Sequence, residues 1–236
     1  MSLSDVTEPC EFIKLRREFS DSVSHELKTP LTIISALSEL IENDMVKDKD
    51  IKVFAARISE QAKRLVSIID DIIRLSEFDK GGIPKDFAVF DLYELVQAVA
   101  GSFADNAKGV DIRVTGESLD ISANRRMIDE LLFNLIDNGV KYNREGGSVA
   151  VALSPEDRSC RISVSDTGIG ISKEHHNRVF ERFYRVNSSR SRKTGGTGLG
   201  LSIVKHIVDH HGGRVELESI EDVGTTVTCW FVTGTK

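Results

Sequence analysis

Apolar residues in the first third of the chain recur with the spacing of packed helices. Residues 11–78 contain no glycine and one proline, Pro30. Two series with alternating steps of four and three residues place mostly apolar side chains on one helix face: Val23, Leu27, Pro30, Ile34, Leu37 and Ile41, then Ile58, Ala62, Leu65, Ile69 and Ile72. The polar segment 42–50, with a turn at Asn43-Asp44, predicts a hairpin of helices over residues 11–43 and 51–78.

Two amphipathic helices cannot bury both of these stripes on their own. A homodimer in which two hairpins pair into a four-helix bundle solves this problem most economically. The sequence therefore predicts a dimerising helical domain over residues 1–80.

After Gly81-Gly82 and Pro84, which predict a linker, glycines become frequent and short strand patterns alternate with helical ones. Strands are predicted over residues 149–153, 161–165, 214–219 and 225–232, helices over 92–106, 125–141 and 199–211, and a loop over 187–197. This order predicts an α+β sandwich over residues 81–236, a mixed or antiparallel sheet with helices on one face.

Composition and charge narrow the class of protein. The 236 residues are 40% hydrophobic and 29% charged, so disorder, collagen-like repeats and disulfide scaffolds are excluded for most of the chain. A net charge of −6 argues against generic nucleic-acid binding, so no nucleic-acid partner is expected. The cysteines, Cys10, Cys160 and Cys229, are too far apart to suggest a disulfide framework or a zinc site. No apolar run approaches the roughly 18 residues that span a bilayer, so no direct membrane contact of this chain is expected.

His25 lies off the apolar stripe of the first predicted helix. It is about 200° around the helix from Val23 and from Leu27, so we expect it to face solvent. Glu26 can orient the imidazole and accept its proton while the other ring nitrogen attacks an electrophile. Pro30 is expected to bend or loosen the helix one turn later. A surface histidine with a chance acidic neighbour remains the alternative.

The predicted helix 125–141 carries Asn134, Asn138 and Lys141 on one polar face. Two amides and an ammonium group can coordinate Mg²⁺ and hold phosphate oxygens. A solvated polar helix face would show the same pattern.

Two glycine-rich segments follow. Asp166 begins the stretch DTGIGI, in which Gly168 and Gly170 let a flat base approach the backbone while Asp166 accepts a hydrogen bond from an exocyclic amine. An ordinary glycine turn is the alternative. Residues 195–201 (GGTGLGL) open onto a predicted helix and direct its N–H groups at an anion. Residues 180–185 (FERFYR) add two arginines that can contact a terminal phosphate.

Together these segments resemble the cytoplasmic catalytic core of bacterial sensor histidine kinases. Residues 24–31 (SHELKTPL) are similar to the H box of that family, 134–142 (NLIDNGVKY) to the N box and 166–171 to the first glycine box. Residues 180–185 are similar to the F box and 196–201 to the second glycine box. The resemblance extends from about residue 12 to residue 232.

This resemblance implies a role for each motif. His25 is then the phospho-acceptor, Glu26 the base, and Thr29 the residue that positions water when a regulator is dephosphorylated. Asn138, supported by Asn134, is the implied Mg²⁺ ligand. The implied contacts to ATP are Asn134, Asn138, Lys141, Tyr142, Asp166, Gly168, Gly170, Tyr184, Arg185, Gly196, Thr197, Gly198, Leu199 and Gly200.

The implied activity is that of an ATP-dependent protein histidine kinase. Such a homodimer phosphorylates His25, passes the phosphoryl group to an aspartate in the receiver domain of a cognate response regulator, and also dephosphorylates that regulator. The regulator is expected to dock below His25, at a surface including Thr32, Ile33, Ala36 and Leu37. The location implied is cytoplasmic, within a longer parent protein anchored in the bacterial inner membrane.

Two other interpretations stay open on the residues alone. One is a plain ATPase that cycles between conformations, against which Asn134 argues, because related gyrase- and MutL-type ATPases have a water-activating glutamate there. The other is a dimeric binding module without chemistry.

Overall fold

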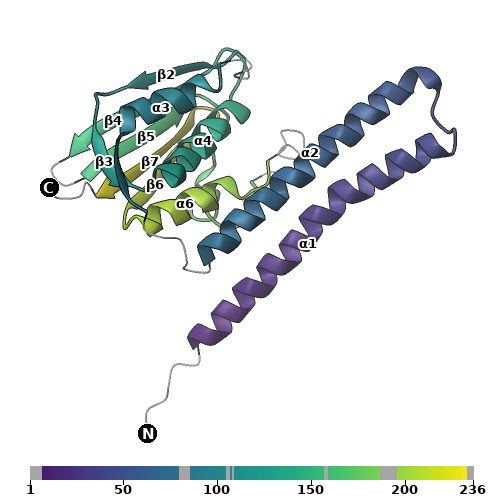
Figure 1. The fold of residues 1–236 in the computed structure, drawn as a ribbon, viewed down its shortest axis with the longest axis horizontal. Coiled ribbons are helices and arrows are strands. Elements are labelled where there is room, and N and C mark those ends of the chain that lie inside the picture. Colours follow the sequence, from purple (N-terminus) through teal and green to yellow (C-terminus); the bar gives the residue numbers. More distant parts are fainter. Residues whose placement is uncertain are drawn as a thin grey trace, which may run out of the picture. The chain divides into compact units, whose positions relative to one another are not determined.

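The computed structural model describes residues 7–79, 86–104, 107, 109–156, 159–186 and 196–232, with the backbone alone for 7–19 and 77–79. The chain divides into two compact units, Met1–Glu77 and Phe78–Lys236. The first is helical and the second combines helices with strands (Figure 1). The predicted boundary between residues 80 and 81 lies outside the described residues.

The first unit is a hairpin of two long helices, α1 (Thr7–Glu42) and α2 (Asp48–Asp79), as predicted. The turn begins where the Asn43 N–H donates to the Glu39 carbonyl at 3.0 Å, and Asp44 then takes a φ of 53°. Pro30 lies inside α1, and the helix continues on both sides of it. The expected loosening at Pro30 therefore does not interrupt the helix.

The apolar stripe predicted on α1 is confirmed, because all six of its positions are buried or half-buried. The stripe predicted on α2 is wrong in part, since Ala62 is exposed and Ile69 is 41% exposed. A series with the same alternation of four and three, shifted along α2, is buried or half-buried throughout: Phe54, Ile58, Gln61, Leu65, Ile68, Ile72 and Leu75. Helix α2 carries apolar residues on a second face as well, so spacing alone did not distinguish the two faces.

The second unit is built on a five-stranded mixed sheet in the order β2-β4-β5-β7-β6. Its strands are β2 (Asp111–Thr115), β4 (Ser148–Glu156), β5 (Ser159–Asp166), β6 (Arg214–Ile220) and β7 (Gly224–Val232). Strand β2 pairs parallel with β4, and the other neighbours are antiparallel. Two further short strands, β1 (Ala88–Asp91) and β3 (Asp120–Ala123), form a separate antiparallel pair.

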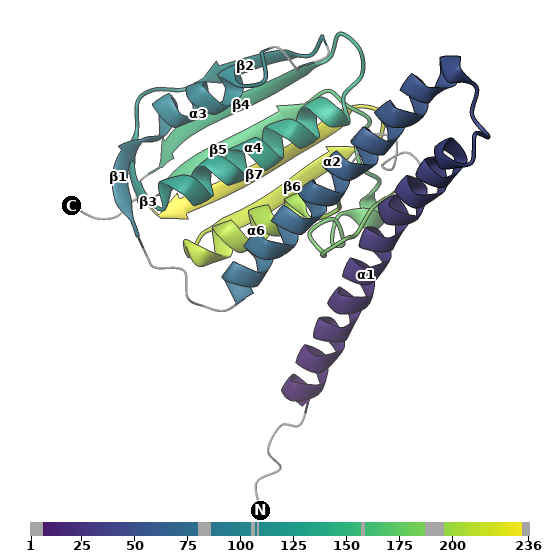
Figure 2. The same cartoon turned by 45° about the vertical axis from the view of Figure 1, so that its right-hand side comes forward.

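Three helices lie along one face of the five-stranded sheet: α3 (Leu92–Gly101), α4 (Arg125–Lys141) and α6 (Gly200–His210) (Figure 2). Their inward residues are fully buried, as at Leu132, Ile136 and Ile207. A short 3-10 helix, η1 (Lys173–His175), lies between β5 and α6 in the sequence. The predicted α+β fold with helices on one face is confirmed.

Some elements differ from the sequence prediction. Strands β1, β2 and β3 were not predicted, because runs of four or five residues give too little alternation to recognise. Helix α3 ends at Gly101 rather than at residue 106, and the Ser102 N–H closes its last turn on the carbonyls of Ala98 and Val99 at 3.2 and 3.1 Å. Of the predicted loop 187–197, residues 187–195 lie outside the described part of the chain.

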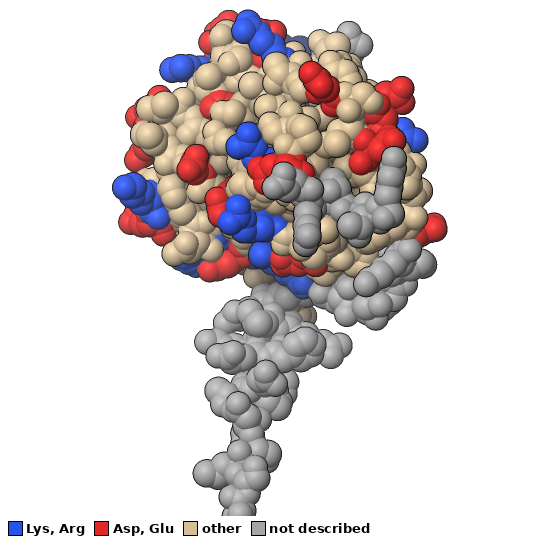
Figure 3. All heavy atoms as spheres, turned by 90° about the vertical axis from the view of Figure 1, so that its left-hand side faces the viewer, with Lys and Arg blue, Asp and Glu red and all other residues tan. Residues whose placement is uncertain are grey.

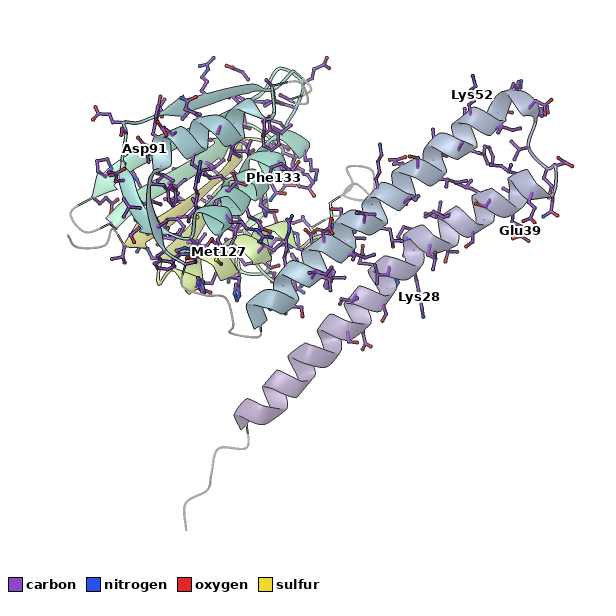
Figure 4. The ribbon with its side chains drawn as sticks, in the orientation of Figure 1. Lys28, Glu39, Lys52, Asp91, Met127 and Phe133 are labelled. Carbon is purple, nitrogen blue, oxygen red and sulfur yellow. The ribbon has the colours of Figure 1, made fainter. Side chains whose placement is uncertain are left out.

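The start of α4 is fixed from two sides. Asn124 caps it, accepting the Met127 N–H at 3.1 Å, and the Asn124 N–H donates to Nε2 of His211 at 3.1 Å, just beyond α6. Asp91 caps α3 similarly by accepting the Tyr93 N–H at 2.7 Å (Figure 4).

Within the described ranges, no helix has both the length and the apolar character needed to cross a bilayer.

Candidate active site

The candidate phospho-acceptor His25 is exposed on α1, as predicted. Lys28, one turn further along, points away from α2 (Figure 4). The hydroxyl of Thr29 donates to the His25 carbonyl at 3.1 Å, so this side chain bonds back to its own helix. The imidazole therefore lies on a solvent-facing side of the hairpin.

Glu26, the neighbour of His25, is held by the opposite helix. Its Oε2 lies 3.4 Å from Nη2 of Arg64 on α2. Arg64 was not among the residues predicted from the sequence. In the sequence, Arg64 is a basic residue directly before Leu65 of the predicted α2 stripe. Basic residues beside an apolar stripe are too common for this position to be singled out.

Helix α4 brings Asn134 and Asn138 to the N-terminus of α6. A Cβ on Gly200, the first residue of α6, would lie 2.9 Å from Oδ1 of Asn134 and 3.6 Å from Nδ2 of Asn138. The Asn134 amide also donates to the Glu130 carbonyl at 2.9 Å. Two amides thus meet a helix N-terminus, where backbone N–H groups and the helix dipole favour an anion.

Lys141 is the last residue of α4, and Tyr142 is its C-cap. The Lys141 ammonium pairs with Asp137 at 2.6 Å, one turn back. A Cβ on Gly196 would lie 2.5 Å from the Tyr142 hydroxyl, while one on Gly168 would run into the Tyr142 carbonyl. Tyr142 therefore touches both glycine segments that the sequence singled out.

Asp166 ends β5 and begins the first glycine segment. Its Oδ1 accepts the Gly168 N–H at 2.8 Å. Burial raises the pKa of the Asp166 carboxyl above its ordinary value, against the lowering effect of N–H donors from Gly168 and Thr225. A half-buried carboxyl beside close-packed glycine backbone suits recognition of an amine on a flat base.

The loop after Asp166 rests on the turn between β6 and β7. A Cβ on Gly170, which has a φ of 63°, would run into the Ile220 carbonyl. The Asp222 N–H donates to the Ile169 carbonyl at 2.8 Å, and the Ile171 N–H donates to the Ser219 hydroxyl at 2.8 Å. Only glycine fits at position 170, and the turn fixes the loop's path.

A second set of bonds joins this loop to α4. The Asn143 amide donates to the carbonyls of Gly139 at 2.9 Å and Ser148 at 3.0 Å. The Thr167 hydroxyl donates to Asn143 Oδ1 at 3.2 Å and accepts the Ser148 N–H at 2.8 Å. Asn143 and Thr167 were not predicted as positioning residues, although Asn143 directly follows the motif 134–142 and Thr167 lies within the motif 166–171.

The segment before the second glycine motif is tied to it by backbone contacts. Arg185 donates through Nη2 to the Gly196 carbonyl, and the Phe183 N–H donates to the Gly198 carbonyl at 2.9 Å. The Tyr184 hydroxyl lies 2.7 Å from Nδ1 of His175, a partner that the sequence analysis did not identify. The F-box segment and the start of α6 are therefore joined.

Two further predicted residues lie at the entrance to α6. The Leu199 N–H donates to the Thr197 hydroxyl at 3.2 Å. Leu199 itself is fully buried, so it can meet a ligand only through its backbone. The predicted nucleotide residues of α4, the glycine segments and the start of α6 thus converge in one unit.

No group of three or more His, Cys, Asp or Glu side chains among the described residues is arranged to hold a metal ion. Figure 3 shows basic and acidic side chains interspersed over one face of the molecule. Any cation here would therefore depend on the two amides and on oxygens brought by a ligand.

Comparison with known proteins agrees with this arrangement. Residues 15–81 match the His Kinase A (phospho-acceptor) domain, and residues 123–234 match the histidine kinase-, DNA gyrase B- and HSP90-like ATPases. The chain is 36% identical over 241 residues to the sensor histidine kinase WalK of Bacillus subtilis, covering 95% of this chain and 38% of that protein.

Solved structures are similar across both units. The histidine kinase ThkA, in complex with the response regulator protein TrrA, has a TM-score of 0.74 and 24% identity, covering 99% of this chain and 68% of that one. This identity supports likeness of fold alone. Full-length ShkA in complex with AMPPNP has a TM-score of 0.67 and 27% identity, covering 93% of this chain and 47% of that one.

A helical hairpin with an exposed histidine, followed by an ATPase-type α+β unit, defines the catalytic core of a histidine kinase. The chain belongs to the bacterial sensor histidine kinases, with their phospho-acceptor and ATPase domains in sequence. It spans about two fifths of the length of WalK.

Proposed function

We propose that this chain phosphorylates its own His25 with ATP and passes the phosphoryl group to an aspartate of a response regulator. The observation that carries the proposal is the exposed His25 on a hairpin of the phospho-acceptor family, in a chain that also has an ATPase unit. In the reaction, one imidazole nitrogen attacks the γ-phosphorus, the bond to the β-phosphate oxygen breaks, and ADP leaves. Glu26 accepts the proton from the other ring nitrogen.

The ATP site that we propose is the convergence of α4, the two glycine segments and the start of α6. Asp166 receives the adenine amine, and the close-packed backbone at Gly168 and Gly170 accommodates the flat base. Lys141, Tyr142, Tyr184, Arg185 and residues 196–200 surround the ribose and phosphates. Positioning and neutralisation of charge supply most of the catalysis.

We propose Asn138, supported by Asn134, as the protein ligand of Mg²⁺. Mg²⁺ keeps several waters and is commonly held by one or two protein oxygens together with substrate phosphates. Two amides at the N-terminus of α6 fit this need without a cluster of carboxylates. When bound, the ion neutralises phosphate charge.

We propose that two chains form a homodimer through their hairpins. Apolar side chains remain exposed on α2, with Val66 at 57%, Ile73 at 52% and Ile69 at 41%. A second hairpin can bury this face in a four-helix bundle.

We also propose a cytoplasmic location for this chain, because the proposed reaction consumes ATP, which is supplied in the cytoplasm. Anchoring of a longer parent protein in the inner membrane stays a prediction.

The regulator is proposed to dock on α1 beyond His25. Thr32, Ile33 and Ala36 are exposed there, whereas Leu37 is half-buried. Ile33→Asp is expected to slow transfer from phosphorylated His25 to the receiver domain while sparing autophosphorylation. Equal loss of both would contradict this docking surface.

Thr29 is proposed to support dephosphorylation of the regulator. Thr29→Ala is expected to keep kinase activity and lose the phosphatase activity, and unchanged dephosphorylation would refute this role.

The proposed kinase activity is tested by incubating the chain with γ-phosphate-labelled ATP and Mg²⁺. Label that is lost in acid and retained in alkali, and that moves to an added receiver domain, is expected. Sustained phosphate release without a phosphoprotein would indicate a plain ATPase instead. Asp166→Asn should abolish labelling, whereas Asp209→Asn, on the exposed side of α6, should not.

A further inference from the structure

The guanidinium of Arg64 reaches across the hairpin to the residue beside the phospho-acceptor. Its Nη2 lies 3.4 Å from Oε2 of Glu26, although the two residues are 38 positions apart in the sequence. The side chain of Arg64 is 10% exposed and that of Glu26 22% exposed. The contact is therefore a partly buried ion pair between α1 and α2, on the flank of the helix that carries His25.

The chemistry of this pair differs from that of a surface salt bridge. A guanidinium taken out of water is costly unless it is fully paired. The Nε of Arg64 is nevertheless buried without a hydrogen-bond partner in the described part of the chain. Nε and Nη2 share one edge of the planar group, which can hold a carboxylate with two parallel bonds. Of the two N–H groups on the guanidinium edge that faces Glu26, only Nη2 therefore forms a hydrogen bond to the carboxylate.

A half-buried glutamate on a helix flank can still adopt several rotamers. A cation on the opposite helix favours the rotamer in which the Glu26 carboxylate faces α2. The pair also leaves the carboxylate on the α1 flank adjoining His25, because consecutive helical residues are only about 100° apart.

We propose that Arg64 is a positioning residue for phosphorylation of His25: it holds the Glu26 carboxylate on the flank of α1 from which Glu26 accepts the imidazole proton. This inference rests on the proposed role of Glu26 as the base. Arg64 contacts neither ATP nor the imidazole in this role and acts only through Glu26.

A double-mutant cycle tests the proposal in the full chain. Initial rates of autophosphorylation are measured over a range of ATP concentrations for the parent chain, Glu26→Gln, Arg64→Met and the double variant. Arg64→Met is expected to lower kcat about tenfold with KM for ATP unchanged, and Arg64→Lys to recover most of that loss. In the Glu26→Gln background, Arg64→Met is expected to cause no further loss.

Arg57→Met is the matched control, because Arg57 lies two turns earlier on α2 and is exposed. It is expected to leave kcat unchanged. Arg64→Gln repeats the cycle with a polar side chain, and helical circular dichroism with thermal unfolding shows that each variant is folded.

Three results would overturn the inference: losses that add in the double variant, a rise in kcat for Arg64→Met, or an unchanged kcat for both Arg64→Met and Arg64→Gln. The same measurements distinguish a failure of the proposed role of Glu26 from a failure of the proposed role of Arg64. If Glu26→Gln keeps full activity, Glu26 is not the base. If Glu26→Gln is slow while both Arg64 variants are normal, only the role of Arg64 fails.

Discussion

The close approach of Gly200 to two amides of α4 makes Gly200→Ala a sharp test of the proposed ATP site. The new Cβ would lie 2.9 Å from Oδ1 of Asn134 and 3.6 Å from Nδ2 of Asn138. The first separation is too short for carbon and oxygen, so Asn134 has to turn. It then loses the 2.9 Å bond from its amide to the Glu130 carbonyl.

The size of the effect follows from these contacts. In the free chain, the lost hydrogen bond costs about 1 kcal/mol of folding free energy. Replacing a helical glycine with alanine offsets roughly 0.5–1 kcal/mol of that cost, so global stability should change little. ATP binding is weakened separately, because Asn134 has to return against the new methyl group before it can contact the ligand; a cost of about 2 kcal/mol that is met only in the bound state weakens ATP binding about 30-fold.

The assay is calorimetric titration of the chain with ATP in the presence of Mg²⁺, alongside denaturant unfolding. Gly101→Ala is the control, since Gly101 also lies in a helix and a Cβ there meets nothing within 4 Å. It should bind ATP normally. If Gly200→Ala also bound ATP within twofold of the parent chain, the site would not lie between α4 and the start of α6.

Three further predictions concern the second unit. Burial lowers the pKa of His211 below its ordinary 6.5, so the stability that this neutral ring contributes is present above pH about 6.5 and lost as the pH falls below it. Between pH 7.5 and 5.5, the free energy of unfolding should fall less for His211→Gln than for the parent chain. An equal fall in both would show that His211 does not cause this pH dependence. Burial raises the pKa of Cys160 to about 11 and of Cys229 to about 12. Both thiols should therefore resist a thiol reagent at pH 8 until the chain unfolds, and prompt labelling of either in the native chain would contradict this. Ser219→Ala removes the acceptor of the Ile171 N–H and should raise KM for ATP severalfold with little change in kcat, whereas Ser163→Ala, elsewhere on the sheet, should not. An unchanged KM for Ser219→Ala would show that this bond does not position the glycine loop.

Much of the fold was predictable because its long elements carry strong periodicity. Strands β4, β5, β6 and β7 are seven to nine residues long, and helices α1 and α2 keep a regular spacing over many turns. The errors came from short or ambiguous patterns. The strands β1 to β3 are only four or five residues long, and α2 has two apolar faces, of which spacing selected Ala62 and Ile69 on the exposed one.

The candidate site was predictable at its motifs but not in the bonds between them. The spacing of Asn134 and Asn138 already placed both amides on one helix face. The bond from Thr167 to Asn143, the pairing of Tyr184 with His175 and the reach of Arg64 to Glu26 depend on how distant elements pack. No local pattern carries that information.

The central claim is that His25 receives the γ-phosphoryl group of ATP. The most direct measurement is to incubate the chain with ATP and Mg²⁺ and to map the phosphorylated residue by mass spectrometry under alkaline conditions, with His25→Gln in parallel. A single phosphorylated residue at His25, absent from the folded His25→Gln chain, is expected. Phosphorylation that persists in His25→Gln, or that maps to another residue in the parent chain, would contradict the claim.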